Sequence, residues 1–563
     1  MITFEYNEEM KVIKASLDND SRHEGIYMSG GVYQSRKNCF LFPMNEENID
    51  ILYRKYQPQN TRNLPIVWKN SLREEILKRT QDKVKDTVNT NFLRSLTVEN
   101  ITQLPYLIKN NTDQQPFVNQ HISQYWGSYI PHHALLWEMG TGKTRAAIDI
   151  FMIKKEQGDV ETGLVLCPKS MVNKWVVEIE KWSDCKAMPF YGTKEDKLET
   201  LEEKWDWIVV TFESFERYRE EFLAIVDEKR FVILDETTKI KNPKAKRAKA
   251  CHDLGLKTKH KLILTGTPVT QHAYDVFSQF KFLDCGETFG FDYDSFINQY
   301  FWRRGYSLIA RSGAIEEISK KMYGKSATRF LKKDCIDIPD KVYDSVLLDL
   351  PPETNVKYKE MVKWAITQLE GGQRVTASII LTQLLRLSQI TSGFVKDVSG
   401  NELPFKENPK LDALEDIIEN SNSNKIIVWG RFVHDIRAIK GLCDKMGVKA
   451  VTIFGEDGQA ARTENVRQFQ EEPDCKVIIG TAGSGGHGID LTAASIVVYF
   501  SNSYSLEQRL QSEDRAHRAG QKNQVTYIDL LCKDTIDVAI YKVLRSKKNI
   551  ADIVTQDNLR SFL

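Results

Sequence analysis

The first stretch that could carry out chemistry is LLWEMGTGKT, Leu135–Thr144, where an apolar run leads into a glycine-containing loop and a Lys-Thr pair. The next residues, RAAIDIFMIKK, read as a helix, so backbone N–H groups and a helix N-terminus converge where an anion can bind. Lys143 would reach the β- and γ-phosphates of a nucleotide, and the Thr144 hydroxyl would bind Mg²⁺. The strict pattern G-x-x-x-x-G-K-[ST] fails at its first position, Trp137, so a chance match stays open. The loop residues that would wrap the phosphates are Met139, Gly140, Thr141 and Gly142.

A second candidate is FVILDETTKIKN, in which Asp235 and Glu236 end an apolar run. Two adjacent carboxylates at the end of a buried strand cost free energy unless something positive meets them. Asp235 could hold Mg²⁺ and Glu236 could position and polarise a water molecule, as phosphoryl transfer to water requires. The alternative is a turn at the end of a strand whose two acids are solvated. The position of this pair in the same α/β region as Lys143 favours the catalytic interpretation.

A third candidate is QSEDRAHRAGQ, Gln511–Gln521, which places Gln511, Arg515 and Arg518 at i, i+4 and i+7. A helix that starts after Ser505 would display all three along one face, and Ser505 and Gln508 have the capping-box spacing. Arg509 points off that face, so its replacement by Ala is expected to be close to neutral. The arginines would bind an anion, or they form a solvated charged face.

Two series of short apolar runs must position these residues. The spacing between the runs predicts helices, and strands of this kind are typical of parallel sheets covered on both faces. We expect one α/β lobe at about 111–282, a mainly helical region at 283–404 and a second α/β lobe at about 405–563. The runs are HALLW, GLVLCP, DWIVVTFES, FVILDE and KLILTGTP in the first lobe, and KIIVWGR, KAVTIFGE, KVIIGTA, SIVVYFS and QVTYIDLL in the second.

Residues 1–110 predict a small α+β module. GIYMSGGVYQSRKNCFLFPM predicts a hairpin that turns at Gln34–Asn38, followed by a helix from Asn45 or Glu46 onward.

Composition excludes several classes of protein. The 563 residues are 41% apolar and 28% charged, and no apolar run approaches the ~18 residues of a membrane span. The start MITFEYNEEM is unlike a secretory signal, so we expect an intracellular protein without a membrane partner. It would be cytoplasmic in a bacterium or a virus-infected cell, and nuclear in a eukaryote. Nine cysteines without a C-x-x-C pair indicate reduced thiols. The 78 basic and 77 acidic residues nearly balance, so the overall charge does not indicate a polyanionic partner.

The order of eight blocks resembles the helicase-like ATPases of superfamily two, and more narrowly the Swi/Snf branch of double-stranded DNA translocases. The resemblance covers about residues 111–545, and eight blocks in order are far more specific than any one of them. The blocks are Gln120 in PFVNQHISQYW, WEMGTGKT, LCPKSMVNKWVVEIEKW, VVTFES, DETTKIKN, LTGTPVTQ, TAGSGGHGIDL and QSEDRAHRAGQ.

The resemblance implies a fold and an ATP site. The fold would be α/β, with two RecA-like parallel-sheet lobes, helical insertions between them and the N-terminal module. ATP would bind between the lobes, where Arg518 acts as an arginine finger and Arg515 assists it. Gln120 would read adenine, a plausible task for an amide that can both donate and accept. By the same resemblance Gly488 would contact the nucleotide, and Thr265, Thr267 and Gln511 would couple nucleotide state to lobe movement.

The resemblance also implies contacts to double-stranded DNA, with forks or other branched DNA as a further candidate. Short polar residues and free N–H groups at strand ends suit phosphates and cannot read bases, although ordinary helix caps would look the same. A basic run from Lys239 to Lys249 is either a further DNA surface or a solvated helix face. The residues expected at DNA are Pro168, Lys169, Ser170, Thr211 and Thr481.

Three positions depart from the family pattern. Trp137 replaces an Asp or Ala, Thr238 replaces the histidine that links the ATP site to the LTGTP segment, and Asp490 replaces an Asn. The catalytic residues are all present, so we expect hydrolysis to survive. Thr238 instead puts the coupling in doubt, and the charge of Asp490 could alter nucleotide or DNA contacts.

The leading interpretation is a motor that uses ATP and Mg²⁺ to translocate on or remodel double-stranded DNA. One alternative is a strand-separating or strand-annealing helicase, since residues 25–44 faintly resemble the small module of HepA-related annealing helicases. Another is an ATP-gated DNA clamp that hydrolyses weakly. Protein partners are unknown.

Overall fold

A computed structural model gives the fold, and packing divides the chain into two units, Met1–Ile336 and Asp337–Leu563. Within the described residues, every helix is too short or too polar to span a membrane. The expected division of the chain into four parts stays a prediction. The structure describes residues 2–7, 12–17, 32–34, 39–43, 52, 66–69, 71–72, 91–97, 99–108, 114–266, 268–269, 272–305, 307–370, 377–397, 399–483 and 489–546.

Unit 1 is built on a seven-stranded sheet in the order β14-β6-β11-β10-β7-β9-β8, and all neighbouring strands are parallel. The five strands predicted for this lobe are confirmed. They are β6 (His132–Leu135), β7 (Thr162–Cys167), β9 (Trp207–Thr211), β10 (Arg230–Asp235) and β11 (Lys261–Leu264), and the short edge strands are β8 (Ala187–Pro189) and β14 (Ala327–Thr328).

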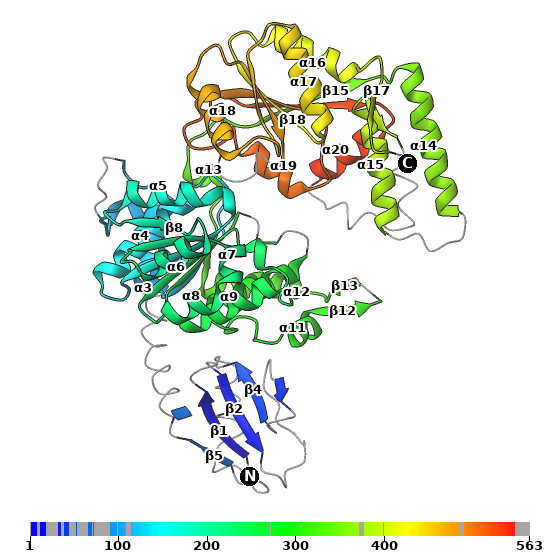
Figure 1. The fold of residues 1–563 in the computed structure, drawn as a ribbon. Helices are drawn as coiled ribbons and strands as arrows, with labels where there is room; N and C mark the ends of the chain where they lie inside the picture. Colours follow the sequence, from blue (N-terminus) through cyan, green and yellow to red (C-terminus); the bar gives the residue numbers. More distant parts are fainter. Residues whose placement is uncertain are drawn as a thin grey trace. The chain divides into compact units, whose positions relative to one another are not determined.

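Helices cover both faces of this sheet (Figure 1), so successive strand residues enter two separate cores. On β7, Leu164 and Leu166 join the first core, whereas Val165 and Cys167 join the second. The first core lies under α7 (Phe212–Arg217), α8 (Arg219–Ile225), α9 (Lys246–Lys257), α10 (Val276–Asp284), α11 (Tyr293–Tyr300) and α12 (Ala314–Lys325). The second lies under α4 (Lys143–Glu156) and α5 (Val172–Trp182), while α3 (Val118–Tyr129) packs on α4 and α6 (Lys194–Glu202) follows β8.

Unit 2 contains a six-stranded parallel sheet in the order β15-β22-β21-β18-β20-β19. The five strands predicted for the second lobe are confirmed as β18 (Lys425–Gly430), β19 (Ala450–Ile453), β20 (Val477–Thr481), β21 (Ala494–Tyr499) and β22 (Thr526–Cys532). Its helices are α14 (Pro352–Glu370), α15 (Ala377–Thr391), α16 (Pro409–Asn420), α17 (Val433–Lys445), α18 (Gln459–Glu471), α19 (Leu506–Glu513) and α20 (Ile536–Arg545). Local signals start several of them: Asn408 caps α16, whose first residue is Pro409, and Thr535 caps α20.

The region 283–404 contains the expected helices α11, α12, α14 and α15, but it also contains strands that the sequence did not predict. A hairpin forms from β12 (Phe301–Arg304) and β13 (Ser307–Ala310). Two further strands join the large sheets, since β14 pairs with β6 and β15 (Val342–Leu348) pairs with β22. The short strands β16 (Phe394–Lys396) and β17 (Glu402–Pro404) pair with each other, and α13 spans Lys332–Cys335. These strands depend on partners far away in the sequence, which local patterns do not reveal.

The N-terminal region forms a five-stranded sheet in the order β3-β4-β2-β1-β5. The predicted hairpin is confirmed, because β3 (Val32–Gln34) runs antiparallel to β4 (Cys39–Pro43) and pairs Gln34 with Cys39. The helix predicted from Asn45 or Glu46 begins outside the described residues. The remaining strands are β1 (Ile2–Asn7), β2 (Val12–Leu17) and β5 (Ile66–Trp68).

Candidate functional site

The sheet of unit 1 gathers most of the candidate residues at one edge, because parallel strands place their carboxyl ends together. The loop that contains Lys143 follows β6, Thr265 follows β11 and Asp235 ends β10, and these three strands are neighbours. Pro168 follows β7 and Thr211 ends β9, which continue the same edge. The structure therefore brings the predicted nucleotide residues and the unit 1 part of the predicted DNA set onto adjoining loops.

The loop after β6 has the backbone geometry of an anion-binding turn. Gly140 and Gly142 have φ of 78° and 80°, in the left-handed region that favours glycine. The Nζ of Lys143 donates to the carbonyl oxygens of Trp137 (2.9 Å) and Glu138 (3.2 Å), and the Thr141 hydroxyl donates to Glu138 (2.7 Å). Thr144 lies in the first turn of α4, next to Lys143.

Helix α3 holds this loop through two amide side chains. Gln120 accepts a hydrogen bond from the Phe117 N–H (2.8 Å) and donates from Nε2 to the carbonyl of Gly142 (3.0 Å). A Cβ on Gly142 would lie 2.1 Å from that Nε2, so the close approach requires glycine. Asn119 donates to the carbonyl of Thr141 (2.8 Å). The sequence identified Gln120 but not Asn119. Nothing in the local sequence distinguishes Asn119 from an ordinary polar residue next to Gln120.

Trp137, where the strict phosphate-loop pattern fails, is a core residue. Its indole Nε1 donates to the Thr328 hydroxyl (2.8 Å), and its ring packs edge-to-face on Phe330 at 5.4 Å. His133 lies 3.0 Å from the same hydroxyl through Nε2. The tryptophan thus ties the start of the loop to the segment that contains β14, and the departure from the pattern has a packing reason.

The acid pair ends β10 in a constrained arrangement. Asp235 is buried, and its Oδ2 accepts a hydrogen bond from the indole Nε1 of Trp175 on α5 (2.9 Å). Glu236 has φ 55° and ψ 58°, a left-handed conformation that costs a residue with a side chain about 1–3 kcal/mol and clusters at functional sites. Trp175 was missed, because a tryptophan on an amphipathic helix reads as core.

The residues expected to couple nucleotide state to movement are only partly described. Thr265 is buried at the end of β11, and its N–H donates to the carbonyl of Leu135 at the end of β6 (3.3 Å). Thr267 and Gly488 lie outside the described residues.

The predicted DNA residues fall into both units. Lys169 and Ser170 are exposed in a short 3₁₀ turn, and Pro168 precedes it. The Thr211 hydroxyl accepts a hydrogen bond from the Ser214 N–H (3.0 Å), so it caps α7, which is the ordinary role left open for it. Thr481 ends β20 in unit 2.

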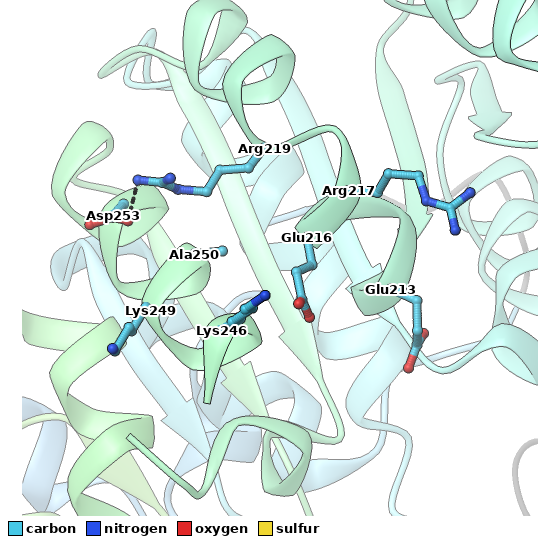
Figure 2. A pocket seen from close by; sticks show the side chains of 8 residues that line it. All are labelled: Glu213, Glu216, Arg217, Arg219, Lys246, Lys249, Ala250 and Asp253. Atoms are coloured by element: carbon cyan, nitrogen blue, oxygen red, sulfur yellow. Dashed lines mark hydrogen bonds and ion pairs between the residues drawn. The ribbon is translucent and has the colours of Figure 1, made fainter. Parts of the chain in front are cut away.

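A groove of about 700 Å³ lies between α7, the start of α8 and α9 (Figure 2). Lys246 and Lys249 of the basic run line it, but so do the acids Glu213 and Glu216. Arg219 donates to Asp253 (2.7 Å) beside them, as Figure 2 shows. Charges of both signs make this groove a poor phosphate surface, which favours the solvated-face alternative for this part of the run.

The helix predicted after Ser505 is shorter than expected. Ser505 does cap it, since its hydroxyl accepts from the Gln508 N–H (3.2 Å), but α19 ends at Glu513. The carbonyl of Glu513 accepts the Tyr527 hydroxyl (2.8 Å), and the carbonyl of Arg515 accepts the Leu491 N–H (3.1 Å). The Glu513 carbonyl also accepts the His517 N–H (3.3 Å), and Arg515 and Arg518 lie in the turns that follow the helix.

The two arginines nevertheless converge. Nη1 of Arg515 and Nη1 of Arg518 lie 3.4 Å and 3.5 Å from the carbonyl oxygen of Ile489. The Nε of Arg518 also lies 3.6 Å from Oδ2 of Asp490, one of the residues that depart from the family. Gln511 is buried and donates to Glu507 (3.1 Å).

Arg509 corrects an expectation, because it is only 5% exposed and is not a surface residue. Its guanidinium pairs with both oxygens of Asp529 (2.5 and 2.9 Å) and with Glu513 (2.8 Å), and it stacks 3.4 Å from the Tyr499 ring centre. Burial alone would raise the pKa of Glu513, but attraction to Lys341 and Arg509 outweighs burial and holds that pKa below its usual value. The near-neutral effect expected of Arg509→Ala assumed a position without partners, and these contacts give a physical reason to expect a loss of stability instead.

Comparisons with known proteins agree with this architecture. An SNF2-related domain matches residues 123–393, and a helicase conserved C-terminal domain matches residues 409–520. An uncharacterized ATP-dependent helicase of Mycoplasma genitalium is 24% identical over 432 residues, which are 76% of this chain and 40% of that protein. The DNA annealing helicase and endonuclease ZRANB3 of Homo sapiens is 25% identical over 433 residues, 73% of this chain and 38% of that protein.

Among solved structures, the Sulfolobus solfataricus SWI2/SNF2 ATPase core in complex with dsDNA is 26% identical, with a TM-score of 0.39, and the match covers 81% of this chain and 96% of that chain. The chain spans about 40% of the length of the curated relatives that it matches. The two domain matches contain the loop after β6, the acid pair and both arginines of the last motif. The chain belongs to the SNF2-related, or Swi/Snf, branch of the superfamily-two helicase-like ATPases.

Proposed function

We propose that the chain hydrolyses ATP and uses the energy to translocate on or remodel double-stranded DNA. The observation that carries this proposal is the placement of the Lys143 loop and the Asp235–Glu236 pair at the carboxyl edge of one parallel sheet, on strands separated only by β11. Phosphoryl transfer needs a phosphate cradle and a water-orienting acid close together, and this edge supplies both.

The phosphates of ATP would bind the loop after β6. Lys143 donates to carbonyls of its own loop, and a charged phosphate oxygen is a stronger acceptor than a carbonyl, so we expect the ammonium group to turn toward the nucleotide. Gln120 would read adenine while it keeps its bond to Gly142, because its Nε2 has a second hydrogen and its Oε1 a second lone pair. Residues 139–142 contribute backbone N–H groups.

Mg²⁺ fits the residues at this edge. Thr144 offers a hydroxyl and Asp235 a carboxylate, and oxygen ligands of this kind are the ones Mg²⁺ prefers beside phosphates. The Trp175 indole orients the Asp235 carboxylate through Oδ2. When bound, the ion would neutralise charge on the β- and γ-phosphates.

Glu236 would orient the attacking water, and its left-handed backbone keeps the carboxylate at a fixed place after the strand. Arg518, assisted by Arg515, would stabilise charge on the γ-phosphate, so that hydrolysis depends on closure of the protein around ATP. Thr265, Thr267 and Gln511 would couple that closure to the nucleotide.

DNA would be held through its phosphates by Pro168, Lys169, Ser170 and Thr211, together with Thr481. The relatives support a DNA substrate and leave the alternatives open, since they include an annealing helicase and the ATPase of an ISWI chromatin-remodeling complex. Forked or other branched DNA is therefore a second candidate substrate. A DNA substrate would place the protein in the bacterial or virus-infected cytoplasm, or in a nucleus.

The test is steady-state ATP turnover with blunt duplex, single strands and forks, with Lys143→Ala as the inactive control. We expect duplex to stimulate turnover more than single strands do, and affinity for duplex to fall by about 0.9 log units per contacted phosphate per decade of salt. Turnover that only RNA stimulates, or an affinity that ignores salt, contradicts the proposal. Weak turnover that DNA does not stimulate, together with DNA binding that requires ATP, supports the clamp alternative instead.

A further inference from the structure

We infer that Gln279 of α10 connects the catalytic loop after β10 to the loop after β11, a positioning role that rests on the proposed function. The Thr237 hydroxyl donates to Oε1 of Gln279 (2.6 Å). Nε2 of Gln279 donates to the carbonyl oxygens of Pro268 (2.8 Å) and Asp275 (3.0 Å). One side chain thus joins the residue after Glu236 to the LTGTP segment and to the start of α10.

Burial makes the loss of these hydrogen bonds costly. Thr237 and Gln279 are buried, with exposures of 0% and 1%. A buried amide or hydroxyl that loses its partner costs about 1–3 kcal/mol. The pair therefore tolerates only arrangements in which the two loops keep their relative positions, so a shift of one loop is passed to the other.

The position of the link gives it a function. Thr237 follows Glu236, which has a left-handed backbone conformation, and Pro268 lies three residues after Thr265. The family pattern has a linking histidine where this chain has Thr238. Here the connection runs through the preceding Thr237 and a glutamine of α10, so Thr238 need not abolish coupling.

A double-mutant cycle tests this role. Gln279→Leu keeps the volume and removes all three hydrogen bonds of the amide, Thr237→Val removes the hydroxyl and Thr237→Ser keeps it. We expect the KM for ATP to stay within about 2-fold, the kcat with duplex to fall about 10-fold in Gln279→Leu and Thr237→Val, and the double variant to be no worse than either, because one broken link cannot be broken twice. Thr237→Ser should stay near the parent.

Additive losses, a rise in KM with kcat unchanged, or a Thr237→Ser variant as slow as Thr237→Val would overturn the link. Thermal unfolding of each variant shows whether a loss of kcat results merely from an unfolded protein. If the parent itself shows no DNA-stimulated turnover, the proposed function fails rather than the role of Gln279.

A separate feature of unit 1 is the outer face of the β12–β13 hairpin, which projects beside α11 and α12 (Figure 1). Trp302 and Ile309 are cross-strand partners on this face and are 59% and 46% exposed. The other face is anchored, since Phe301 is buried against Tyr274 and Phe296, with ring centres 5.6 Å and 6.0 Å apart. The hairpin therefore presents large apolar side chains to solvent from a fixed base.

Within residues 295–315 the charge is positive only, and the acids Asp294, Glu316 and Glu317 flank this stretch. Residues 295–315 contain Arg303, Arg304 and Arg311 and no Asp or Glu, in a chain whose net charge is +1. The Arg311 guanidinium lies 3.7 Å from the Trp302 ring centre, and Arg303 pairs with Asp294 (2.6 Å) behind the hairpin. An exposed tryptophan beside arginines, on a projecting two-stranded ribbon, matches the shape and chemistry that bind nucleic acid.

We propose that this face contacts branched DNA, with Arg304 and Arg311 at phosphates and Trp302 stacked on an unpaired base where strands part. Stacking needs an unstacked base, which a fork offers and a blunt duplex does not. This contact would favour junctions over continuous duplex and lies outside the predicted DNA residues.

Binding of fluorescent forks and blunt duplexes without ATP tests the proposal. Trp302→Ala should weaken fork binding about 5- to 100-fold, the range for one stacked base, and leave blunt duplex binding within about 2-fold. Arg304→Ala should weaken both and reduce the salt slope by about 0.9. The control is Trp364→Ala, which removes a tryptophan of α14 that is 51% exposed.

Fork affinity in Trp302→Ala equal to that in Trp364→Ala would exclude the stacking contact. An unchanged salt slope in Arg304→Ala would exclude the phosphate contact. If the parent binds neither DNA, the proposed function fails instead, so the two failures are distinguishable.

Discussion

The Nε of Arg518 lies 3.6 Å from Oδ2 of Asp490, so the proposed arginine finger has a carboxylate neighbour in unit 2. Both side chains are partly exposed, and such ion pairs contribute about 0.2–1 kcal/mol. If the γ-phosphate competes with Asp490 for the guanidinium, Asp490→Asn should raise ATP turnover by up to about 5-fold at low salt. The gain should shrink as salt screens the pair. Unchanged turnover at low salt would show that Asp490 does not restrain Arg518.

Loss of Arg518 should abolish most turnover without loss of ATP binding. Arg518→Ala, and nearly as much Arg518→Lys, should slow DNA-stimulated hydrolysis by roughly 10³-fold or more, because a lysine lacks the forked guanidinium. Arg515→Ala should also be damaging. Nucleotide affinities of the purified variants, measured beside their turnover, check this. Turnover of Arg518→Ala within a few-fold of the parent would mean that Arg515 and Arg518 form a solvated charged face instead.

The phosphate site should separate binding from hydrolysis. Lys143→Ala should lose nucleotide binding and keep the fold, whereas Glu236→Gln should bind ATP and fail to hydrolyse it. Glu236→Gly should be inactive as well but more stable than Glu236→Gln, because glycine adopts the left-handed backbone without strain. Calorimetric ATP binding and urea unfolding measure both effects. Normal hydrolysis in Glu236→Gln would remove Glu236 from the catalytic role.

Arg509→Ala should destabilise the protein by about 3–5 kcal/mol, since it leaves the fully buried Asp529 without its cation, although Glu513 keeps its pair with Lys341 (3.1 Å). Arg437 provides the matched control: its pair with Glu456 is exposed, so Arg437→Ala should cost about 0–1 kcal/mol. Urea unfolding of the two variants compares them directly. Equal stabilities would mean that the buried cluster contributes no more than a surface pair.

The buried His133 should make stability fall in acid. Burial, with the neighbouring His132, lowers the pKa of His133 from its usual 6.5 to about 3. Between these values the unfolded chain binds a proton that the folded chain does not, so stability decreases as pH drops below about 6.5. His133→Gln, which can still bond to the Thr328 hydroxyl, should show a shallower decrease in unfolding free energy between pH 7 and pH 4. An unchanged slope would assign the acid sensitivity to other groups.

Local sequence predicted the parts of this fold whose signals lie within a few residues. Apolar runs such as KIIVWGR and FVILDE became β18 and β10, and Ser505 became the cap of α19. The loop around Lys143 followed from glycines that must adopt positive φ before a helix. These features were predictable because backbone preference and strand burial act over a few neighbouring residues.

The features that the sequence missed depend on partners far along the chain. Trp137 bonds to Thr328, Val342 of β15 pairs with Thr526, and Thr237 meets Gln279. Arg509 has an ordinary helical position, and only Asp529 across the fold turns it into a buried ion pair. Just beyond α19, the carbonyl of Glu513 likewise bonds to the distant Tyr527 hydroxyl. The sequence alone determined the ten strands of the two apolar series, the loop that contains Lys143 and the family. The tertiary structure decided the remaining strand pairs and which polar groups are buried together, because their partners are distant in sequence and bonds between buried groups exist only after packing.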